Sequence, residues 1–317
     1  AGILVSGAYP AWLLSASPVS GVLKGLIQKN LGGGRLRKGL VVFQFTASIA
    51  LITATWLVSR QINYLNNLDL GIDIEHVLTM DAPNLTNWDS TYIGKLDAFK
   101  ETLKTYSGIL AAASSNRAPG DPNLGRIFQI QKSGEVSAEQ SYTCGFMNVD
   151  HNYAATYGLK PLAGRFFEKN DHNPDFEKLE SIVLSESAVK MFGFPSNEAA
   201  LSAGLRFWDQ NWKVVGILPD FHQKSLHEPI EPILFVPSYS TGNQVSIRVA
   251  GENLDKTIAF TQKTFLEFFP GNVFKYAFVD ENFQKMYADD VRFGNILGFF
   301  TLLTMLIACL GLFGLAS

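Results

Sequence analysis

Residues 39–59, GLVVFQFTASIALITATWLVS, form the stretch of sequence that decides how the rest of the chain is organised. The stretch carries no formal charge and a single amide, that of Gln44. A helix rises about 1.5 Å per residue, so these roughly 21 residues would span about 30 Å, the thickness of a bilayer's hydrocarbon core. The alternative is a buried helix in a large soluble protein, but such helices rarely run this far without a charge. The sequence therefore predicts a transmembrane helix over 39–59.

Charged residues on either side of this helix indicate its orientation. The preceding part of the chain contains no acid, and its basic residues are Lys24, Lys29, Arg35, Arg37 and Lys38. The helix is followed by Arg60 and then by the acids Asp69, Asp73, Glu75 and Asp81. Lys and Arg in short loops hold the basic side in the cytoplasm. We therefore expect residues 1–38 to be the end of a preceding transmembrane helix and a basic cytoplasmic loop.

A second apolar stretch lies at the other end of the sequence. Residues 293–316, FGNILGFFTLLTMLIACLGLFGLA, contain no charge and one amide, Asn295. They predict a transmembrane helix over 293–317 that returns towards the cytoplasm. Small residues let helices approach closely in lipid, although they can also face lipid without a packing role. The small residues in this stretch are Gly298, Gly311 and Gly314.

The two membrane helices enclose an outer domain at 60–292. Helix-like sequence at 59–68 continues the first membrane helix, and residues 281–292 lead into the second. We call these two segments the stalks and expect each stalk to form one continuous helix with its membrane helix. One face of the second stalk carries Phe283, Met286 and Tyr287.

The bulk composition limits the class of protein. The chain has 317 residues, 47% hydrophobic and 17% charged, and this charged fraction is low for a purely soluble protein. A net charge of -3 provides no basic field for nucleic acid, so we expect no nucleic-acid partner. The two cysteines are Cys144 and Cys309, and the second lies in the predicted membrane helix. We expect no disulfide between them, so the outer domain depends on its own core.

The outer domain begins and ends with similar β-α-β units. In the first unit, strands at 76–81 and 109–115 flank a helix with one apolar face. In the second, strands at 244–249 and 273–279 flank another such helix, which Asn253 is expected to cap. The apolar faces are formed by Ile93, Leu96, Phe99 and Leu103 in the first helix, and by Ile258, Phe265 and Phe268 in the second. The sequence therefore predicts an α+β fold in which both units share one split βαβ subdomain, assigned to residues 69–118 and 238–280.

The residues between these units, 119–237, are predicted to form an inserted β-rich subdomain. Ser185 is expected to cap one short helix at 185–192. Turn dipeptides such as Asp121-Pro122 and Pro219-Asp220 separate the remaining short apolar runs. The predicted strands are 126–131, 142–149, 181–184, 212–218 and 233–236.

Polar clusters in the outer domain are candidates for chemistry, and each has a simpler explanation. The densest cluster contains Asp220, His222, His227 and Glu228. Its two histidines are five residues apart and would reach one metal only across a turn, so we interpret the cluster as a turn at the end of a strand. The acids Asp69, Asp73 and Glu75 lack the twelve-residue loop of a calcium site. The remaining candidates lack ligand spacing or a nucleophile elbow, namely His151, His172 and Ser185. We expect no catalytic, cofactor-binding or metal-binding residue and no enzymatic activity in this chain.

Five phrases together resemble a known family. They are SGAYPAWLLSASPVSGVLKG ending at Gly25, LRKGLVVFQFTASIALI, RQINYLNNLDLGID, VVGILPDFHQKSLHEPIEP within 214–232, and IACLGLFGLA near the end of the chain. Together they resemble the FtsX-like permease family of ABC transporters with a MacB-type periplasmic core domain. The order of the phrases is most similar to double-length permeases of Bacteroidetes-type bacteria, of which this chain would be part of the second half.

The resemblance implies a multi-pass protein of the bacterial inner membrane with its large domain in the periplasm. It implies a ferredoxin-like, porter-type subdomain at 69–118 and 238–280, carrying the β-rich insertion. The ATPase would be a separate chain or domain, because no Walker sequence occurs here. Further implied partners are a second permease in a dimer, membrane lipids, and a periplasmic adaptor or outer-membrane channel. No catalytic residue is implied, and the segment that contacts the ATPase would follow Ser317.

The function that follows from this resemblance is mechanotransmission. A partner ATPase would move the membrane helices, and the stalks would carry that motion to the periplasmic domain for export or extraction of a lipid, lipoprotein, peptide or drug. Two alternatives remain open on the sequence. One is a two-span receptor that senses an extracytoplasmic ligand, and the other is an FtsX-like activator of cell-wall hydrolases.

Overall fold

A computed structural model describes residues 33–66, 69–83, 85, 90–133, 141–201, 203–238 and 244–316. The start of the chain, including the apolar segment expected before residue 15 and most of the basic loop, lies outside these residues. The chain divides into two compact units. The membrane unit comprises Ala1–Tyr64 and Asp290–Ser317, and the outer unit comprises Leu65–Asp289.

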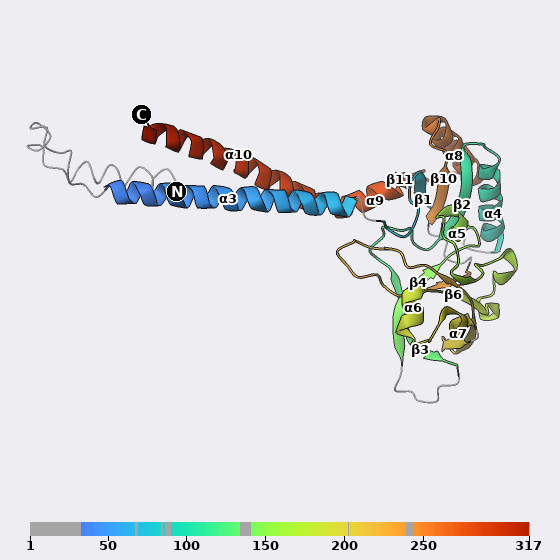
Figure 1. Ribbon diagram of the computed structural model, residues 1–317. Helices are drawn as coiled ribbons and strands as arrows, with labels where there is room; N and C mark the ends of the chain where they lie inside the picture. Colours follow the sequence, from blue (N-terminus) through green and yellow to red (C-terminus); the bar gives the residue numbers. More distant parts are fainter. Residues whose placement is uncertain are drawn as a thin grey trace, which may run out of the picture. The chain divides into compact units, whose positions relative to one another are not determined.

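The membrane unit contains two long helices, α3 (Gly33–Asn66) and α10 (Ala288–Ala316), shown in Figure 1. Both are long and apolar enough to cross a membrane, over Lys38–Tyr64 and Ala288–Phe313. Helix α3 begins within the predicted basic loop and runs without a break to Asn66, which lies in the predicted first stalk. Most large apolar side chains of both helices are exposed, as expected for surfaces that lipid covers.

Small and hydroxyl side chains lie where α3 and α10 meet. The hydroxyl oxygens of Thr55 and Thr301 are 2.8 Å apart, which joins the two helices by a hydrogen bond. A Cβ at Gly294 would lie 3.3 Å from Cδ1 of Ile62, and one at Gly311 would lie 3.4 Å from Oε1 of Gln44. Gly311 therefore lies where the two helices meet, and a methyl group there would make an ordinary contact with the Gln44 side chain. Gly298 has no neighbouring atom within 4 Å of the corresponding position.

The outer unit contains a four-stranded sheet with the strand order β11-β1-β10-β2. All three strand pairs are antiparallel. Helix α4 (Ser90–Lys104) connects β1 to β2, and helix α8 (Leu254–Phe268) connects β10 to β11. The strands are β1 (Val77–Asp81), β2 (Ile109–Ser115), β10 (Gln244–Val249) and β11 (Tyr276–Phe278).

Helices α4 and α8 cover one face of this sheet. Their core contains Phe99 from α4 and Phe265 from α8, whose rings meet edge to face with centroids 6.0 Å apart. Leu78 of β1 and Ile247 of β10 belong to the same core. The two β-α-β segments, separated by more than a hundred residues, thus bury their helices against one sheet.

The insertion forms a seven-stranded sheet with the order β5-β8-β6-β9-β4-β3-β7. Strand β7 also pairs with β8, which closes the sheet into a barrel. The fully buried Trp212 of β8 stacks on Phe207 of β7 inside it. The strands are β3 (Gly125–Lys132), β4 (Tyr142–Asn148), β5 (Ala163–Gly164), β6 (Ser181–Ser185), β7 (Gly204–Phe207), β8 (Gln210–Leu218) and β9 (Ile233–Val236). Short helices lie between them, namely α5 (Tyr153–Thr156), η1 (Lys169–Asp171), η2 (Phe176–Lys178), α6 (Glu186–Met191) and α7 (Asn197–Leu201).

A second core joins the barrel to the open face of the four-stranded sheet. Tyr153 of α5 and the adjacent Tyr157 pack with Val77 and Ala113, which point away from α4 and α8. The buried hydroxyl of Tyr157 lies 2.7 Å from the hydroxyl of Ser246 on β10. The four-stranded sheet is therefore covered on both faces, and the insertion is packed against it rather than hanging from it.

Three local predictions differ from the structure. The predicted strand at 273–279 is only Tyr276–Phe278, and Val279 already begins helix α9 (Val279–Met286). Asn253 precedes α8 in a left-handed conformation, φ 53°, and its side chain makes no capping hydrogen bond. The prediction that the second stalk forms one continuous helix with its membrane helix is wrong, because α9 ends at Met286 and α10 starts at Ala288. Ser185, by contrast, caps α6 as predicted, since its hydroxyl accepts the Ala188 amide.

Candidate functional site at the junction of the two chain ends

The polar cluster singled out in the sequence lies in the segment between β8 and β9. We call residues 220–231 the junction segment. Its first residue, Asp220, accepts hydrogen bonds from the backbone amide of Ser187, at 2.7 Å, and from the Ser187 hydroxyl at the start of α6. At the other end, Glu231 forms ion pairs with Lys224, at 2.8 Å, and with Arg126 of β3, at 2.7 Å. The segment is thus fixed to the barrel at both ends.

The junction segment contacts the chain that follows helix α3. The backbone amide of His222 donates to the carbonyl oxygen of Leu70 at 2.9 Å. Gly71 adopts φ +73°, and a Cβ there would lie 2.5 Å from the carbonyl oxygen of Asp220. Only glycine fits this position without a shift of the backbone, because both the conformation and the space exclude a side chain. Phe221 is buried beside this contact in the second core.

The same segment contacts the chain that precedes helix α10. The backbone amide of Leu226 donates to the hydroxyl oxygen of Tyr287 at 2.7 Å. The ring of His227 meets the Tyr287 ring edge to face, with centroids 5.7 Å apart. Tyr287 is 6% exposed and is the residue that separates α9 from α10. The two ends of the outer unit, one leading from α3 and one leading to α10, therefore meet one segment.

A third contact ties the junction segment to the loop after β2. The side-chain amide of Gln223 donates to the backbone carbonyl of Ala118 at 2.7 Å. The backbone carbonyl of Gln223 accepts a hydrogen bond from the Gly120 amide at 2.9 Å. Gln223 is buried, and Phe283 of α9 packs over Gly120. Burial lowers the pKa of His222 below its usual value, so the neutral ring is favoured beside these contacts.

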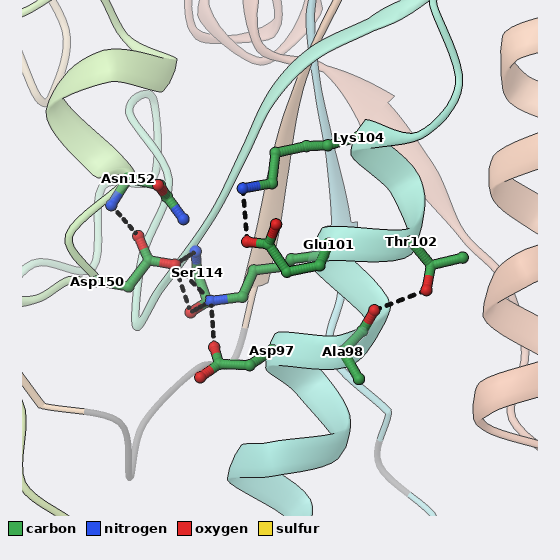
Figure 2. Close-up of polar contacts among 9 residues, drawn as sticks. Asp97, Ala98, Glu101, Thr102, Lys104, Ser114, Asp150 and Asn152 are labelled. Atoms are coloured by element: carbon green, nitrogen blue, oxygen red, sulfur yellow. Dashed lines mark hydrogen bonds and ion pairs between the residues drawn. The ribbon is translucent and has the colours of Figure 1, made fainter. Parts of the chain in front are cut away.

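A buried ion pair connects helix α4 of the four-stranded subdomain to the inserted barrel (Figure 2). Lys100 of α4 is 1% exposed. Its ammonium lies 2.6 Å from Oδ2 of Asp150, which is located between β4 and α5, and 3.0 Å from Oδ1 of Asp97. Asp150 also accepts hydrogen bonds from the amides of Ser114, at 2.8 Å, and Asn152, at 3.0 Å. Burial lowers the pKa of Lys100, but the carboxylates of Asp150 and Asp97 outweigh it and leave that pKa raised. The lysine is therefore charged in the folded protein.

The remaining sequence candidates have structural explanations. Asp73, one of the three acids between positions 69 and 75, forms an ion pair with Arg248 of β10 at 2.7 Å. This ion pair gives Asp73 a structural role that requires no calcium ion. The rings of His151 and His172, distant in sequence, lie edge to face with centroids 5.6 Å apart. Burial is the main cause that lowers the pKa of His172 to about 4. Within the described part of the chain, no three His, Cys, Asp or Glu side chains are grouped as a metal site would require.

Sequence reasoning missed the partners of these residues. The junction segment was identified as a polar cluster, but nothing in its own residues indicates contact with Leu70 or Tyr287. Lys100 lies three residues after Asp97, which is the spacing of an ordinary pair on a helix surface. The apolar residues Phe99 and Leu103, which flank Lys100 in the sequence and are buried in the structure, are the one indication that the Lys100 ammonium is buried as well.

Solved structures similar to this chain include the following three. The periplasmic region of MacB from Actinobacillus actinomycetemcomitans is 17% identical and matches 69% of this chain and 95% of its own, with a TM-score of 0.45. The extracellular domain of the ABC-type transporter YknZ from Gram-positive bacteria is 15% identical and matches 63% and 97%, with a TM-score of 0.42. A domain of a Porphyromonas gingivalis protein described as a permease is 11% identical and matches 63% and 86%, with a TM-score of 0.39. No protein-family model and no curated protein matches the chain.

Proposed function

We propose that this chain is part of a permease subunit of an ABC transporter, with FtsX-like membrane helices and a MacB-type periplasmic domain. The five ordered sequence phrases support the family. The α3 and α10 helices support placement in a membrane, and the basic residues before position 39 support the inner membrane of a bacterium with the large domain outside. The order β11-β1-β10-β2, with one helix in each β-α-β segment, supports a ferredoxin-like, porter-type subdomain.

The proposed mechanism is mechanotransmission. A partner ATPase moves the membrane helices, and the outer domain converts that movement into work on a lipid, lipoprotein, peptide or drug. The observation that carries the proposal is the double attachment of the junction segment, to Leu70 on one side and to Tyr287 on the other. Any relative movement of these two attachment points acts on a segment that continues directly into strands β8 and β9 of the barrel.

The backbone of α3 suits this role. It is one helix of 34 residues, with hydroxyl side chains such as Thr46 and Thr53 bonded back to the carbonyls four residues earlier. A continuous helix transmits displacement along its axis, whereas a Gly/Ser linker would absorb it. A route for cargo through the helices is not required, which agrees with the lack of charged side chains in 39–59 and 293–316.

Isolation of the full-length protein from its native membrane tests the proposal. A tagged protein extracted in mild detergent should carry an ABC-type ATPase with it, and the complex should hydrolyse ATP in a vanadate-sensitive manner. Autophosphorylation without hydrolysis would instead indicate a receptor of the sensor class. Cleavage of peptidoglycan by an attached hydrolase would indicate the cell-wall activator.

A further inference from the structure

We propose that Tyr287 is the residue that couples helix α10 to the barrel, through its hydrogen bond to the backbone of Leu226. The proposal rests on the proposed function and specifies where in the outer domain movement of α10 is received. Tyr287 is a positioning residue in this account, since it acts through the junction segment and touches no cargo.

The break between α9 and α10 is the first observation behind this proposal. Tyr287 has φ -100° and ψ 3°, and its amide bonds to the Gln284 carbonyl at 3.1 Å, three residues back, as in a tightened last turn. Sharp helix breaks normally occur at Pro or Gly, but residues 279–293, VDENFQKMYADDVRF, contain neither. The break is therefore not marked by a Pro or Gly, and it coincides with the residue whose side chain contacts the junction segment.

Those contacts hold Tyr287 from two directions. The hydroxyl accepts the Leu226 amide, and the ring lies against His227, so two consecutive residues of the junction segment engage one side chain. On the α9 side, Phe283 is buried in the second core and Met286 packs against it. Helix α9 is thereby fixed to the outer unit, while α10 begins at the next residue, Ala288. Tyr287 is the residue that directly precedes α10, the helix that enters the membrane unit.

This arrangement gives a directional link. Because Tyr287 directly precedes α10, a rotation or withdrawal of the first turn of that helix acts on the Tyr287 side chain and on its bond to Leu226. Because a hydrogen bond weakens steeply with distance and angle, a small displacement of the hydroxyl releases the Leu226 amide. The junction segment is also bonded to Leu70 through His222, so the release changes how one segment is held between the two chain ends.

Hydrogen exchange at the Leu226 amide tests the link. The full-length protein with its ATPase is placed in lipid nanodiscs and compared without nucleotide and with ATP plus orthovanadate. The test variant is Tyr287→Phe, which keeps the ring and removes only the hydroxyl. The control variant is Tyr157→Phe, which removes another buried tyrosine hydroxyl, one that bonds to Ser246 of β10 and not to the junction segment.

The expected result has two parts. In the protein with Tyr287, nucleotide changes the exchange rate of the Leu226 amide. In Tyr287→Phe the amide exchanges about tenfold faster without nucleotide, because its acceptor is lost, and nucleotide no longer changes the rate. Tyr157→Phe keeps the nucleotide response at Leu226, which a general loss of stability would not explain.

The outcomes separate this proposal from the function on which it rests. If nucleotide changes exchange elsewhere in residues 69–289 but not at Leu226, or if Tyr287→Phe responds as the control does, the coupling role of Tyr287 is wrong and mechanotransmission stands. If nucleotide changes exchange nowhere in the outer domain of the unaltered protein, both proposals fail.

Discussion

The ammonium of Lys100 and the carboxylate of Asp150 form a buried ion pair, 2.6 Å apart, between helix α4 and the insertion. Each side chain is 2% exposed. Desolvation of two charges is costly, and the extra bonds from Asp97, Ser114 and Asn152 are what offset it here. The ion pair and the junction segment have different roles. The ion pair fixes the insertion to α4, whereas the junction segment contacts the two ends of the outer unit.

Removal of one partner of this ion pair should therefore lower the stability of the outer domain strongly. Lys100→Met leaves Asp150 buried without its main counter-charge and should lower the free energy of unfolding of the outer domain by about 3–5 kcal/mol. Lys104→Met is the matched control, since Lys104 pairs with Glu101 on the same helix but at the surface, and should cost less than about 1 kcal/mol. Denaturant titration followed by tryptophan fluorescence measures both. Similar losses in the two variants would contradict a buried, energetically important pair.

The buried His172 should make the outer domain sensitive to acid. Its pKa is lowered by burial to about 4, whereas an unfolded histidine has a pKa of about 6.5. The folded state thus binds fewer protons between these values, so the stabilising contribution is complete above pH 6.5 and is lost as pH falls towards 4. The full change is about 3 kcal/mol for this one group.

Unfolding titrations at pH 7.5 and pH 5 measure this sensitivity. His172→Gln should make the stability difference between the two pH values smaller. The same substitution at the exposed His76 serves as the matched control. A pH dependence that is identical in both variants and in the unaltered protein would show that His172 does not contribute to it.

Substitution of Gly71, which contacts the junction segment, by alanine should strongly lower the free energy of unfolding. Gly71 and Gly193 have nearly the same backbone conformation, φ +73° and +70°, but only Gly71 has a backbone oxygen 2.5 Å from the position of a Cβ. Gly193→Ala should cost about 1–2 kcal/mol from the left-handed conformation alone. Gly71→Ala adds a clash with Asp220 and should cost several kcal/mol in total, about 3 or more. Equal thermal unfolding of the two variants would mean that the chain after α3 is not tightly packed on the junction segment.

The strands of the insertion show what could be predicted from sequence. The predicted strand at 233–236 matches β9, because four apolar residues between prolines leave little choice. The β7–β8 hairpin was missed because its turn residues, Trp208 and Asp209, both have positive φ without a glycine. Turn prediction depends on residues that favour that conformation, and tryptophan does not. The contacts of Phe207, Trp208 and Trp212 hold the turn instead.

The candidate site was predictable only in part. The polar residues of 220–231 stand out in the sequence, but their partners Leu70 and Tyr287 are remote from them along the chain. The break at Tyr287 could not be predicted, because residues 279–293 contain no Pro or Gly that would mark it. The continuity of α3 was predictable, because its apolar and helix-forming residues run without Pro through Asn66.

In the proposed mechanism, movement of the membrane helices reaches the outer domain through continuous backbone and the junction segment. Insertion of Gly-Gly-Ser after Tyr64 interrupts α3 near its outer end, and the same insertion after Gly193, in an exposed turn of the barrel, is the control. In nanodiscs with the partner ATPase, we would measure ATP hydrolysis and the vanadate-dependent change in amide exchange across residues 220–231. The account predicts that the Tyr64 insertion keeps hydrolysis and loses the change, whereas the Gly193 insertion keeps both. An unaltered exchange response in the Tyr64 insertion, at equal abundance and hydrolysis, would contradict it.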